Sequence, residues 1–212
     1  MRRLPGREFL QSDDVIDCDH PDIIATAQEL QSQSGDSQDA VLTARRCFEF
    51  VRDEIAHTGD GGGGPLTCRA SDVLRHRTGF CYAKSHLLCG LLRANEIPAG
   101  LCYQRLCVDH SATQYCLHGF NAVWLPEIGW YRIDPRGNRS DITAQFTPPD
   151  EVLAFSATHA DECTFPDVLP RPLPIVVQAL RSAETWDEFA GDLPDLSERS
   201  LVSGTDEEAA AL

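Results

Sequence analysis

The sequence predicts an α+β protein in which helices come first along the chain and an antiparallel sheet follows. Apolar residues recur every three or four positions over residues 40–55, and a second, broader apolar stripe covers residues 81–94. Strand-like runs then follow at 100–108, 114–125 and 129–134, with a Pro-Glu-Ile-Gly turn before the last run. We therefore expect a central helix to pack against an antiparallel β-sheet.

The first helices have recognisable boundaries. Pro21 suits the first turn of a helix that we expect to run to about Gln33. Ser37 can cap the second helix, which we expect to end near His57, before a run of four glycines. A short helix over residues 69–76 then precedes a Thr-Gly-Phe turn.

The third long helix begins at Cys81 and ends before Pro98, because the residue before a proline is pushed out of helical geometry. Its leucine stripe predicts a buried helix, although Lys84 within it is expected to be solvated. After the sheet we expect a strand near residues 142–146 and two short helices near 175–181 and 183–190.

The charge is concentrated at the two ends of the chain. The 212 residues carry a formal net charge of -15, which argues against a nucleic-acid partner. Residues 1–40 hold three Arg and nine acidic residues, and residues 184–212 hold one Arg and nine acidic residues. We therefore divide the chain into an acidic helical segment at 1–36, a core at 37–183 and an acidic, partly disordered tail from 184.

Cysteine use and hydropathy indicate the compartment. No stretch approaches the roughly 18 apolar residues that a membrane span needs, so no membrane partner is expected. The arginines near the start have no apolar stretch behind them, unlike a secretory signal. The nine cysteines are odd in number and include no Cys-x-x-Cys pair, which favours a reducing cytoplasm and no metal or other cofactor. The oligomeric state stays open.

One cysteine differs from the others in its setting. Cys81 lies in the first turn of the most apolar helix, where unpaired N–H groups and the helix dipole stabilise a thiolate. The same N–H groups can stabilise an oxyanion beside the sulfur. Five other cysteines lie within expected helices or strands, where packing explains them: Cys47, Cys89, Cys102, Cys107 and Cys116.

The hairpin formed by the last two strands places a histidine near a carboxylate. If its pairing is centred on residue 126, His118 lies directly opposite Asp134. If the centre is residue 127, the two residues are diagonal neighbours and still within reach. Because a thiol nucleophile needs a base and the base needs an orienting group, we group Cys81 with these two residues.

These residues lie within motifs that resemble the transglutaminase-like superfamily over roughly residues 40–140. The matching motifs are Gly79-Phe80-Cys81, Leu91-Leu92-Arg93-Ala94 followed by Ile97-Pro98-Ala99, His118 followed by the strand Phe120–Leu125, and Gly129-Trp130 leading to Asp134-Pro135. The resemblance implies a papain-like α+β core over residues 37–183. It also implies that Cys81 is the nucleophile, His118 the general base and acid, and Asp134 the residue that orients the histidine.

The reaction that this resemblance implies is acyl transfer through a thioester. We expect hydrolysis of an amide, peptide or isopeptide bond in a peptide or small-molecule substrate. The alternatives are an acyltransferase that uses an amine acceptor in biosynthesis, and an inactive binding module on the same fold. The large relatives that need calcium carry extra domains, and no EF-hand-like loop is present, so calcium dependence is not expected.

The remaining site residues are less strongly indicated. His57 and Gln104 are candidates for a second oxyanion donor besides the Cys81 N–H, and Tyr82 is a candidate for substrate binding. His57 lies where many relatives have an aromatic residue. Its alternative role, which we favour slightly, is contact with the last carbonyls of a helix. Arg132 shares the face of Asp134, but a surface role is favoured.

Overall fold

The computed structural model describes residues 4–33, 39–61, 64–108 and 114–196. The helices are η1 (Arg7–Leu10), α1 (Pro21–Ser32), α2 (Ala40–Glu54), η2 (Thr58–Asp60), α3 (Ala70–His76), α4 (Cys81–Ala94), α5 (Pro174–Ser182) and α6 (Trp186–Gly191). The strands are β1 (Ala56–His57), β2 (Thr78–Gly79), β3 (Ala99–Cys107), β4 (Tyr115–Leu125), β5 (Gly129–Ile133), β6 (Gln145–Thr147), β7 (Asp150–Val152) and β8 (Cys163–Thr164).

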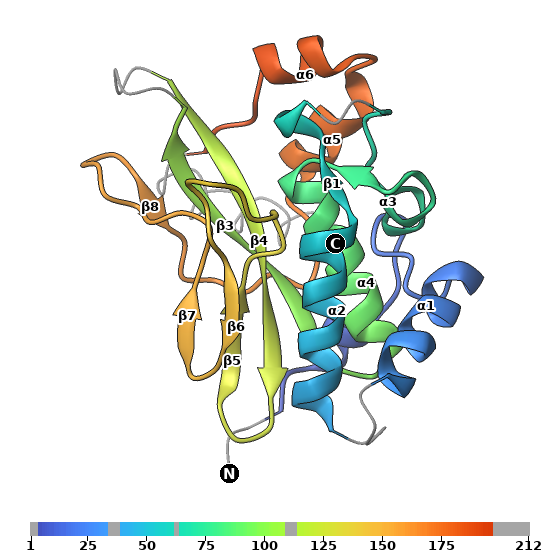
Figure 1. The fold of residues 1–212 in the computed structure, drawn as a ribbon. Coiled ribbons are helices and arrows are strands. Elements are labelled where there is room, and N and C mark those ends of the chain that lie inside the picture. Colours follow the sequence, from blue (N-terminus) through green and yellow to red (C-terminus); the bar gives the residue numbers. More distant parts are fainter. Residues whose placement is uncertain (1–3, 34–38, 62–63, 109–113, 197–212) are drawn as a thin grey trace, which may run out of the picture.

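The fold has a sheet layer and a helical layer, with α4 between them (Figure 1). The main sheet is antiparallel in the order β5-β4-β3-β8. Helix α4 contacts β3 and β4 on one side and α1, α2 and α3 on the other. The α+β class and the central, cysteine-bearing helix are therefore confirmed.

Most expected elements lie within a residue or two of their predicted bounds. Strands β3, β4 and β5 and helices α1, α3 and α4 confirm the sequence pattern. Ser37 lies outside the described residues, and Asp39 caps α2 by accepting the N–H groups of Val41 and Leu42. The strand expected near residues 142–146 begins later, as β6.

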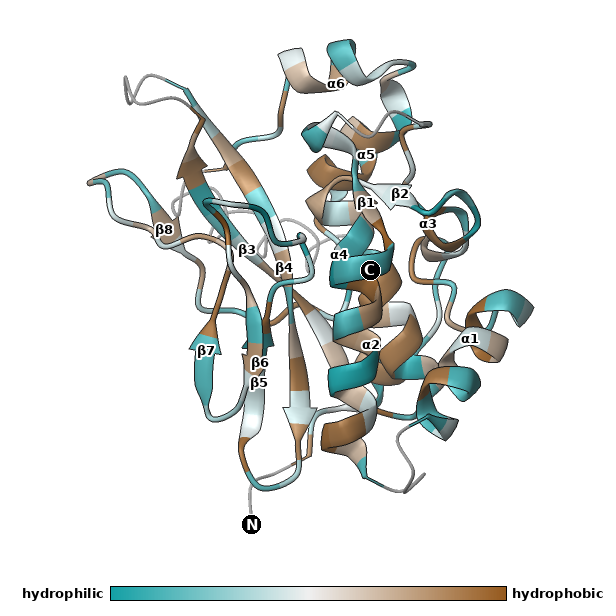
Figure 2. Cartoon of the chain, in the orientation of Figure 1, coloured by the Kyte–Doolittle hydropathy of each residue, from teal (hydrophilic) through white to brown (hydrophobic). Residues whose placement is uncertain are grey.

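Helix α4 is buried along almost its whole length, its hydrophilic residues included, and Figure 2 shows the hydropathy of each element. Leu87, Leu88, Leu91 and Leu92 are fully inaccessible to solvent. Lys84 is also fully buried, so the expectation that it is solvated was wrong. Its ammonium group donates to the carbonyls of Ile55 and Arg52 at the end of α2, and burial lowers its pKa to about 7. Lys84 therefore links helix α4 to the end of helix α2.

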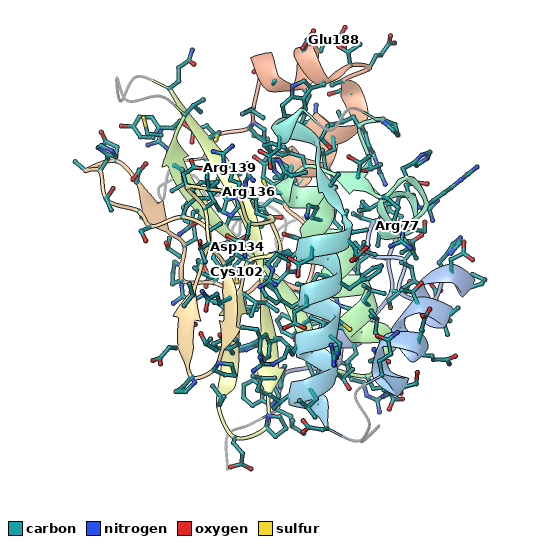
Figure 3. All side chains as sticks on the ribbon, in the orientation of Figure 1. Arg77, Cys102, Asp134, Arg136, Arg139 and Glu188 are labelled. Carbon is teal, nitrogen blue, oxygen red and sulfur yellow. The ribbon has the colours of Figure 1, made fainter. Side chains whose placement is uncertain are left out.

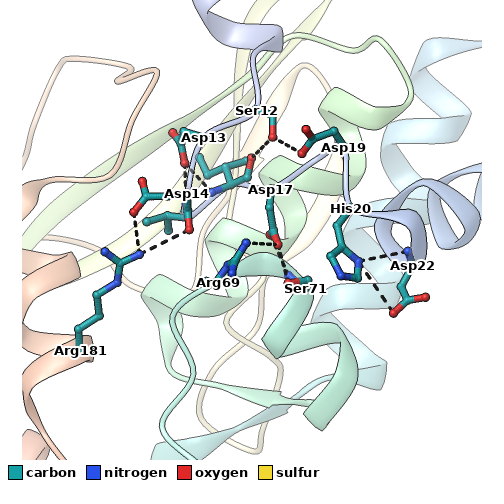
Figure 4. Close-up of polar contacts among 12 residues, drawn as sticks. Ser12, Asp13, Asp14, Asp17, Asp19, His20, Asp22, Arg69, Ser71 and Arg181 are labelled. Atoms are coloured by element: carbon teal, nitrogen blue, oxygen red, sulfur yellow. Dashed lines mark hydrogen bonds and ion pairs between the residues drawn. The ribbon is translucent and has the colours of Figure 1, made fainter.

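The segment before α1 contributes Val15 and Ile16 to the same core, and its polar contacts are shown in Figure 4. Asp17 accepts the backbone N–H of Ser71 at 3.0 Å and lies 3.3 Å from the Arg69 guanidinium. Asp14 pairs with Arg181 of α5 at 2.9 Å. The domain boundaries at residues 36 and 183 stay predictions. The disorder expected in the tail concerns residues beyond 196, outside the described part of the chain.

Within the described ranges, no helix is both long enough and apolar enough to cross a lipid bilayer.

Candidate active site

Cys81 lies at the junction of a short strand and the central helix. Gly79 ends β2, Phe80 is the N-cap residue of α4, and Cys81 is its first helical residue. No side chain among the described residues caps this end of α4, so its first N–H groups are free to donate hydrogen bonds to a developing negative charge. The Cys81 side chain lines a cavity of about 320 Å³.

The cavity lies between the helical layer and the end of the β3–β4 pair at which the chain passes from β3 to β4. The polar and thiol side chains that line it are His57, Cys81, Cys107, Cys116, His118, Arg136, Ser156 and Glu162, and the apolar ones are Phe80, Leu106, Val108, Leu117 and Phe155. A larger cavity of about 580 Å³ lies between residues 13–15 and α5 and contains none of the expected catalytic residues.

Two hydroxyl groups of α4 fix the strand that carries His118. The Tyr82 hydroxyl donates to the carbonyl of Leu117, and the Ser85 hydroxyl donates to the carbonyl of Gly119 at 3.0 Å. Gly119 has no room for a larger residue, since an added Cβ would lie 2.7 Å from Tyr82 Cδ1. Tyr82 is therefore a buried residue that holds His118 in place, and the structure does not bring it into the cavity.

The hairpin register brings His118 and Asp134 together as diagonal neighbours. Val123 pairs with Tyr131 and Leu125 with Gly129, so the pairing is centred on residue 127, the second of the two predicted alternatives. The Nε2 atom of His118 lies 2.8 Å from Oδ2 of Asp134, and both side chains are buried.

Three N–H groups surround the Asp134 carboxylate. It accepts the His118 ring N–H, the backbone N–H of Arg136 at 3.1 Å and that of Ala154 at 3.1 Å. Burial alone would raise the pKa of Asp134, but the His118 charge and these hydrogen bonds lower it below its usual value. An ionised Asp134 fixes a hydrogen on Nε2 of His118 and leaves Nδ1 for the other partner.

His118 is held in its charged form. Burial acts to lower its pKa, but the Asp134 carboxylate, its hydrogen bond and the Cys81 thiol together raise the pKa above the usual range. Phe155 packs edge-on against the ring, with centroids 4.9 Å apart. The site therefore favours an imidazolium beside the sulfur of Cys81.

His57 reaches the same cavity from the helical layer. Strand β1 pairs in parallel with β2, with His57 opposite Gly79, and this places the ring 5.0 Å from that of Phe80. Helix α2 ends at Glu54, and Lys84 binds the carbonyls there, so the helix-end role that we favoured for His57 was wrong. Burial and then the Arg136 charge lower the pKa of His57 to about 3, so the ring is neutral.

Gln104 is not brought into the cavity. It lies opposite His118 across the β3–β4 pair, but its amide nitrogen donates to the carbonyl of Phe155 at 3.2 Å and to the hydroxyl of Thr164 at 3.0 Å. Arg132 binds Glu151 at 3.2 Å, which agrees with the favoured surface role.

An ion pair that the sequence did not indicate borders the site. Both terminal nitrogens of Arg136 bind the Asp60 carboxylate at 2.7 Å, and Arg139 binds it at 3.2 Å. Figure 3 shows Asp134, Arg136 and Arg139 between the sheet and the helices. Arg136 is visible in the sequence only as part of a turn, in which Gly137 has a φ of 111°. Asp60 lies 76 residues earlier and gives no local signal.

The family model described as the transglutaminase-like superfamily matches residues 25–135, just over half of the chain. The chain belongs to this superfamily. The resemblance seen in the sequence is thereby confirmed, and the matched segment contains Cys81, His118 and Asp134. Helices α5 and α6 lie outside it.

Several solved structures are similar to part of this chain. They include a candidate cysteine protease from Cytophaga hutchinsonii, at 17% identity and a TM-score of 0.46 over 63% of this chain and 43% of that one. The periplasmic domain of TgpA from Pseudomonas aeruginosa is 25% identical, with a TM-score of 0.45 over 62% and 48% of the two chains. Red sea bream transglutaminase is 14% identical, with a TM-score of 0.43 over 62% and 32%.

The matched part therefore spans less than half the length of each of these three proteins. No curated protein matches the chain. In the described part of the chain, no group of three or more His, Cys, Asp or Glu side chains is placed to hold a metal ion.

Proposed function

We propose that this member of the transglutaminase-like superfamily is a cysteine enzyme that transfers acyl groups through a thioester on Cys81. The observation that carries the proposal is the 2.8 Å bond between His118 and Asp134, in a cavity that also holds the thiol at the start of α4. Three groups in these roles make up a nucleophile, an acid–base and an orienter.

In the first half-reaction, His118 holds the proton of the Cys81 thiol, and the sulfur attacks the carbonyl carbon of an amide. The N–H groups at the start of α4 stabilise the oxyanion. His118 then gives its proton to the leaving amine through Nδ1, and the C–N bond breaks. Asp134 holds the ring in position and stabilises its charged form throughout.

In the second half-reaction, an acceptor attacks the thioester, His118 takes its proton, and the C–S bond breaks. We propose that water is the acceptor, so that the enzyme hydrolyses amide, peptide or isopeptide bonds in the cytoplasm. The apolar walls of the cavity, which include Leu106 and Phe155, support a peptide or small-molecule substrate with an apolar acyl side. Transfer to an amine is the second candidate, because the same groups serve both acceptors.

The test is to trap the acyl-enzyme. The protein is mixed with a panel of peptide amides and with a p-nitrophenyl ester, quenched in acid, and weighed intact by mass spectrometry. We expect an acyl adduct that maps to Cys81, persists in Cys116→Ala and is lost in Cys81→Ala. Cys116 is the matched control because it lines the same cavity. If neither donor class acylates Cys81, the chain is an inactive module on this fold.

A further inference from the structure

The mechanism above gives no role to His57. His57 lines the same cavity as Cys81 and His118, and its side chain is only 5% exposed. Its Nδ1 atom has no hydrogen-bond partner among the described residues. Oδ1 of Asp60 lies 3.8 Å from Nδ1.

The geometry shows which edge of the His57 ring faces the loop. A Cβ added to Gly59 would lie 3.1 Å from Cε1 of His57 and 3.3 Å from its Nδ1. The Cε1–Nδ1 edge therefore faces Gly59 and Asp60. Nε2 is not part of that edge, and because His57 lines the cavity we assign Nε2 to the cavity side of the ring.

Asp60 is fixed and ionised. Arg136 holds its two oxygens at 2.7 Å each, Arg139 holds one at 3.2 Å, and the hydrogen bonds from Arg136 lower the pKa of Asp60. A carboxylate close to Nδ1 favours the tautomer that carries its hydrogen there. Because the ring is neutral, its Nε2 atom then has only a lone pair, which accepts hydrogen bonds and cannot donate to an oxyanion.

We propose that Nε2 of His57, oriented by Asp60, accepts a hydrogen bond from the acyl acceptor and so positions it for attack on the Cys81 thioester. This inference rests on the proposed function. It replaces the oxyanion role considered for His57 with a role in the second half-reaction alone. Asp60 acts through the ring and is a positioning residue.

The step requires an acceptor with two hydrogens on its attacking atom, which means water or a primary amine. The new C–O or C–N bond forms as one hydrogen leaves as a proton to His118, which is neutral after releasing the first product. The other hydrogen bonds to His57 and stays on the product. The C–S bond breaks, and its electrons return to the sulfur of Cys81. An alcohol has a single such hydrogen and cannot serve both histidines.

The two half-reactions can be measured separately with p-nitrophenyl hexanoate. The burst of nitrophenolate reports acylation of Cys81, and the steady-state rate reports deacylation. We expect His57→Phe to slow deacylation about tenfold, the effect of losing one hydrogen bond, while the burst rate changes less than about threefold. His57→Gln, which restores an amide acceptor near the Nε2 position, should recover part of the loss.

Asp60→Asn provides a second test that leaves His57 in place. It should slow deacylation less than His57→Phe does, again with the burst rate preserved. The matched control is Asp141→Asn, because Asp141 binds Arg139 at 2.8 Å, is 65% exposed, and should leave both rates unchanged. Deacylation by propylamine should be as sensitive to His57→Phe as deacylation by water, whereas ethanol should be a poor acceptor in either protein.

Equal slowing of burst and steady-state rates in His57→Phe would mean that the ring is an oxyanion donor, and it would overturn the inference while leaving the thioester mechanism intact. Unchanged deacylation in a folded His57→Phe protein would overturn it too. If the wild type shows no burst that depends on Cys81, the proposed function fails and this inference fails with it.

Discussion

Two imidazole rings line the cavity, one from each layer of the fold and each beside a carboxylate, and the two imidazole–carboxylate pairs differ in distance and in charge. His118 and Asp134 come from the sheet layer, lie 2.8 Å apart, and hold the ring as an imidazolium. His57 and Asp60 come from the helical layer, lie 3.8 Å apart, and leave the ring neutral. Arg136 and Arg139 bind the carboxylate of Asp60 and share its charge, whereas the carboxylate of Asp134 accepts backbone N–H groups besides its bond to His118.

This contrast shows that a histidine can act as a proton donor or as a neutral hydrogen-bond acceptor, depending on whether its partner carboxylate is also bound by cations. The Asp134 carboxylate raises the pKa of His118, although burial opposes it. Asp60 is committed to Arg136, whose positive charge is the second cause that lowers the pKa of His57, after burial. The His118–Asp134 pair, which we call the tight pair, is therefore suited to move a proton. The His57–Asp60 pair, which we call the loose pair, is suited to orient a neutral molecule.

The largest expected effect comes from removing the charge of the tight pair. Asp134→Asn should lower kcat/KM by about 10³–10⁴-fold, because the amide favours the wrong tautomer of His118 and no longer stabilises its charge. Both half-reactions should be affected, since His118 moves a proton in each. A loss confined to deacylation, as expected for Asp60→Asn, would erase the distinction between the two pairs.

The free energy of unfolding should also depend on pH through the tight pair. The pKa of His118 is raised from 6.5 to about 10, so its contribution is fully present below pH 6.5 and is lost as the pH rises toward 10. Urea unfolding of wild type and His118→Gln should differ more at pH 6 than at pH 9, by an amount on the order of 2 kcal/mol. A difference that grows between pH 6 and pH 9 would contradict the assigned charge.

Tyr82→Phe tests the tether between α4 and the catalytic strand. The hydroxyl loses its bond to the Leu117 carbonyl, which should lower the free energy of unfolding by about 1 kcal/mol in a urea titration. Because the tether lies beside His118, acylation and deacylation should slow by the same factor. A change in the deacylation rate alone would assign Tyr82 to the acceptor side of the cavity.

The smallest effect is expected from crowding the loose pair. In Gly59→Ala the new Cβ would lie 3.1 Å from His57 Cε1 and 3.1 Å from Trp186 Cη2, so the ring must shift by a few tenths of an ångström. Deacylation of the hexanoyl enzyme should slow about threefold with an unchanged burst, since small displacements weaken a single hydrogen bond. An altered burst rate would show that the ring also contacts the donor side.

The tight pair could be predicted from the sequence because its geometry is local. The turn before Gly129 sets the hairpin register, and the register alone places His118 within reach of Asp134. The position of Cys81 follows equally from its helix boundary. Strands β3 to β5 and helix α4 were found for the same reason, since each has a periodic pattern and a recognisable end.

The loose pair could not be predicted, because it depends on contacts between distant segments. Strands β1 and β2 have two residues each, too short for any hydropathy period, and their pairing alone places His57 beside Cys81. Asp60 meets Arg136 across 76 residues. Burial of Lys84 was missed similarly, because the acceptors that compensate it belong to another helix.

The central claim is that Cys81 is the nucleophile of an acyl transfer and that His118 takes the proton of its thiol. Alkylation with iodoacetamide between pH 5 and pH 9, read residue by residue by mass spectrometry, tests it most directly. We expect Cys81 to react selectively below pH 7, because the thiolate is the reactive form, and this reaction to be lost in His118→Ala. If Cys81 reacts no faster than the other eight cysteines at every pH, the claim is contradicted.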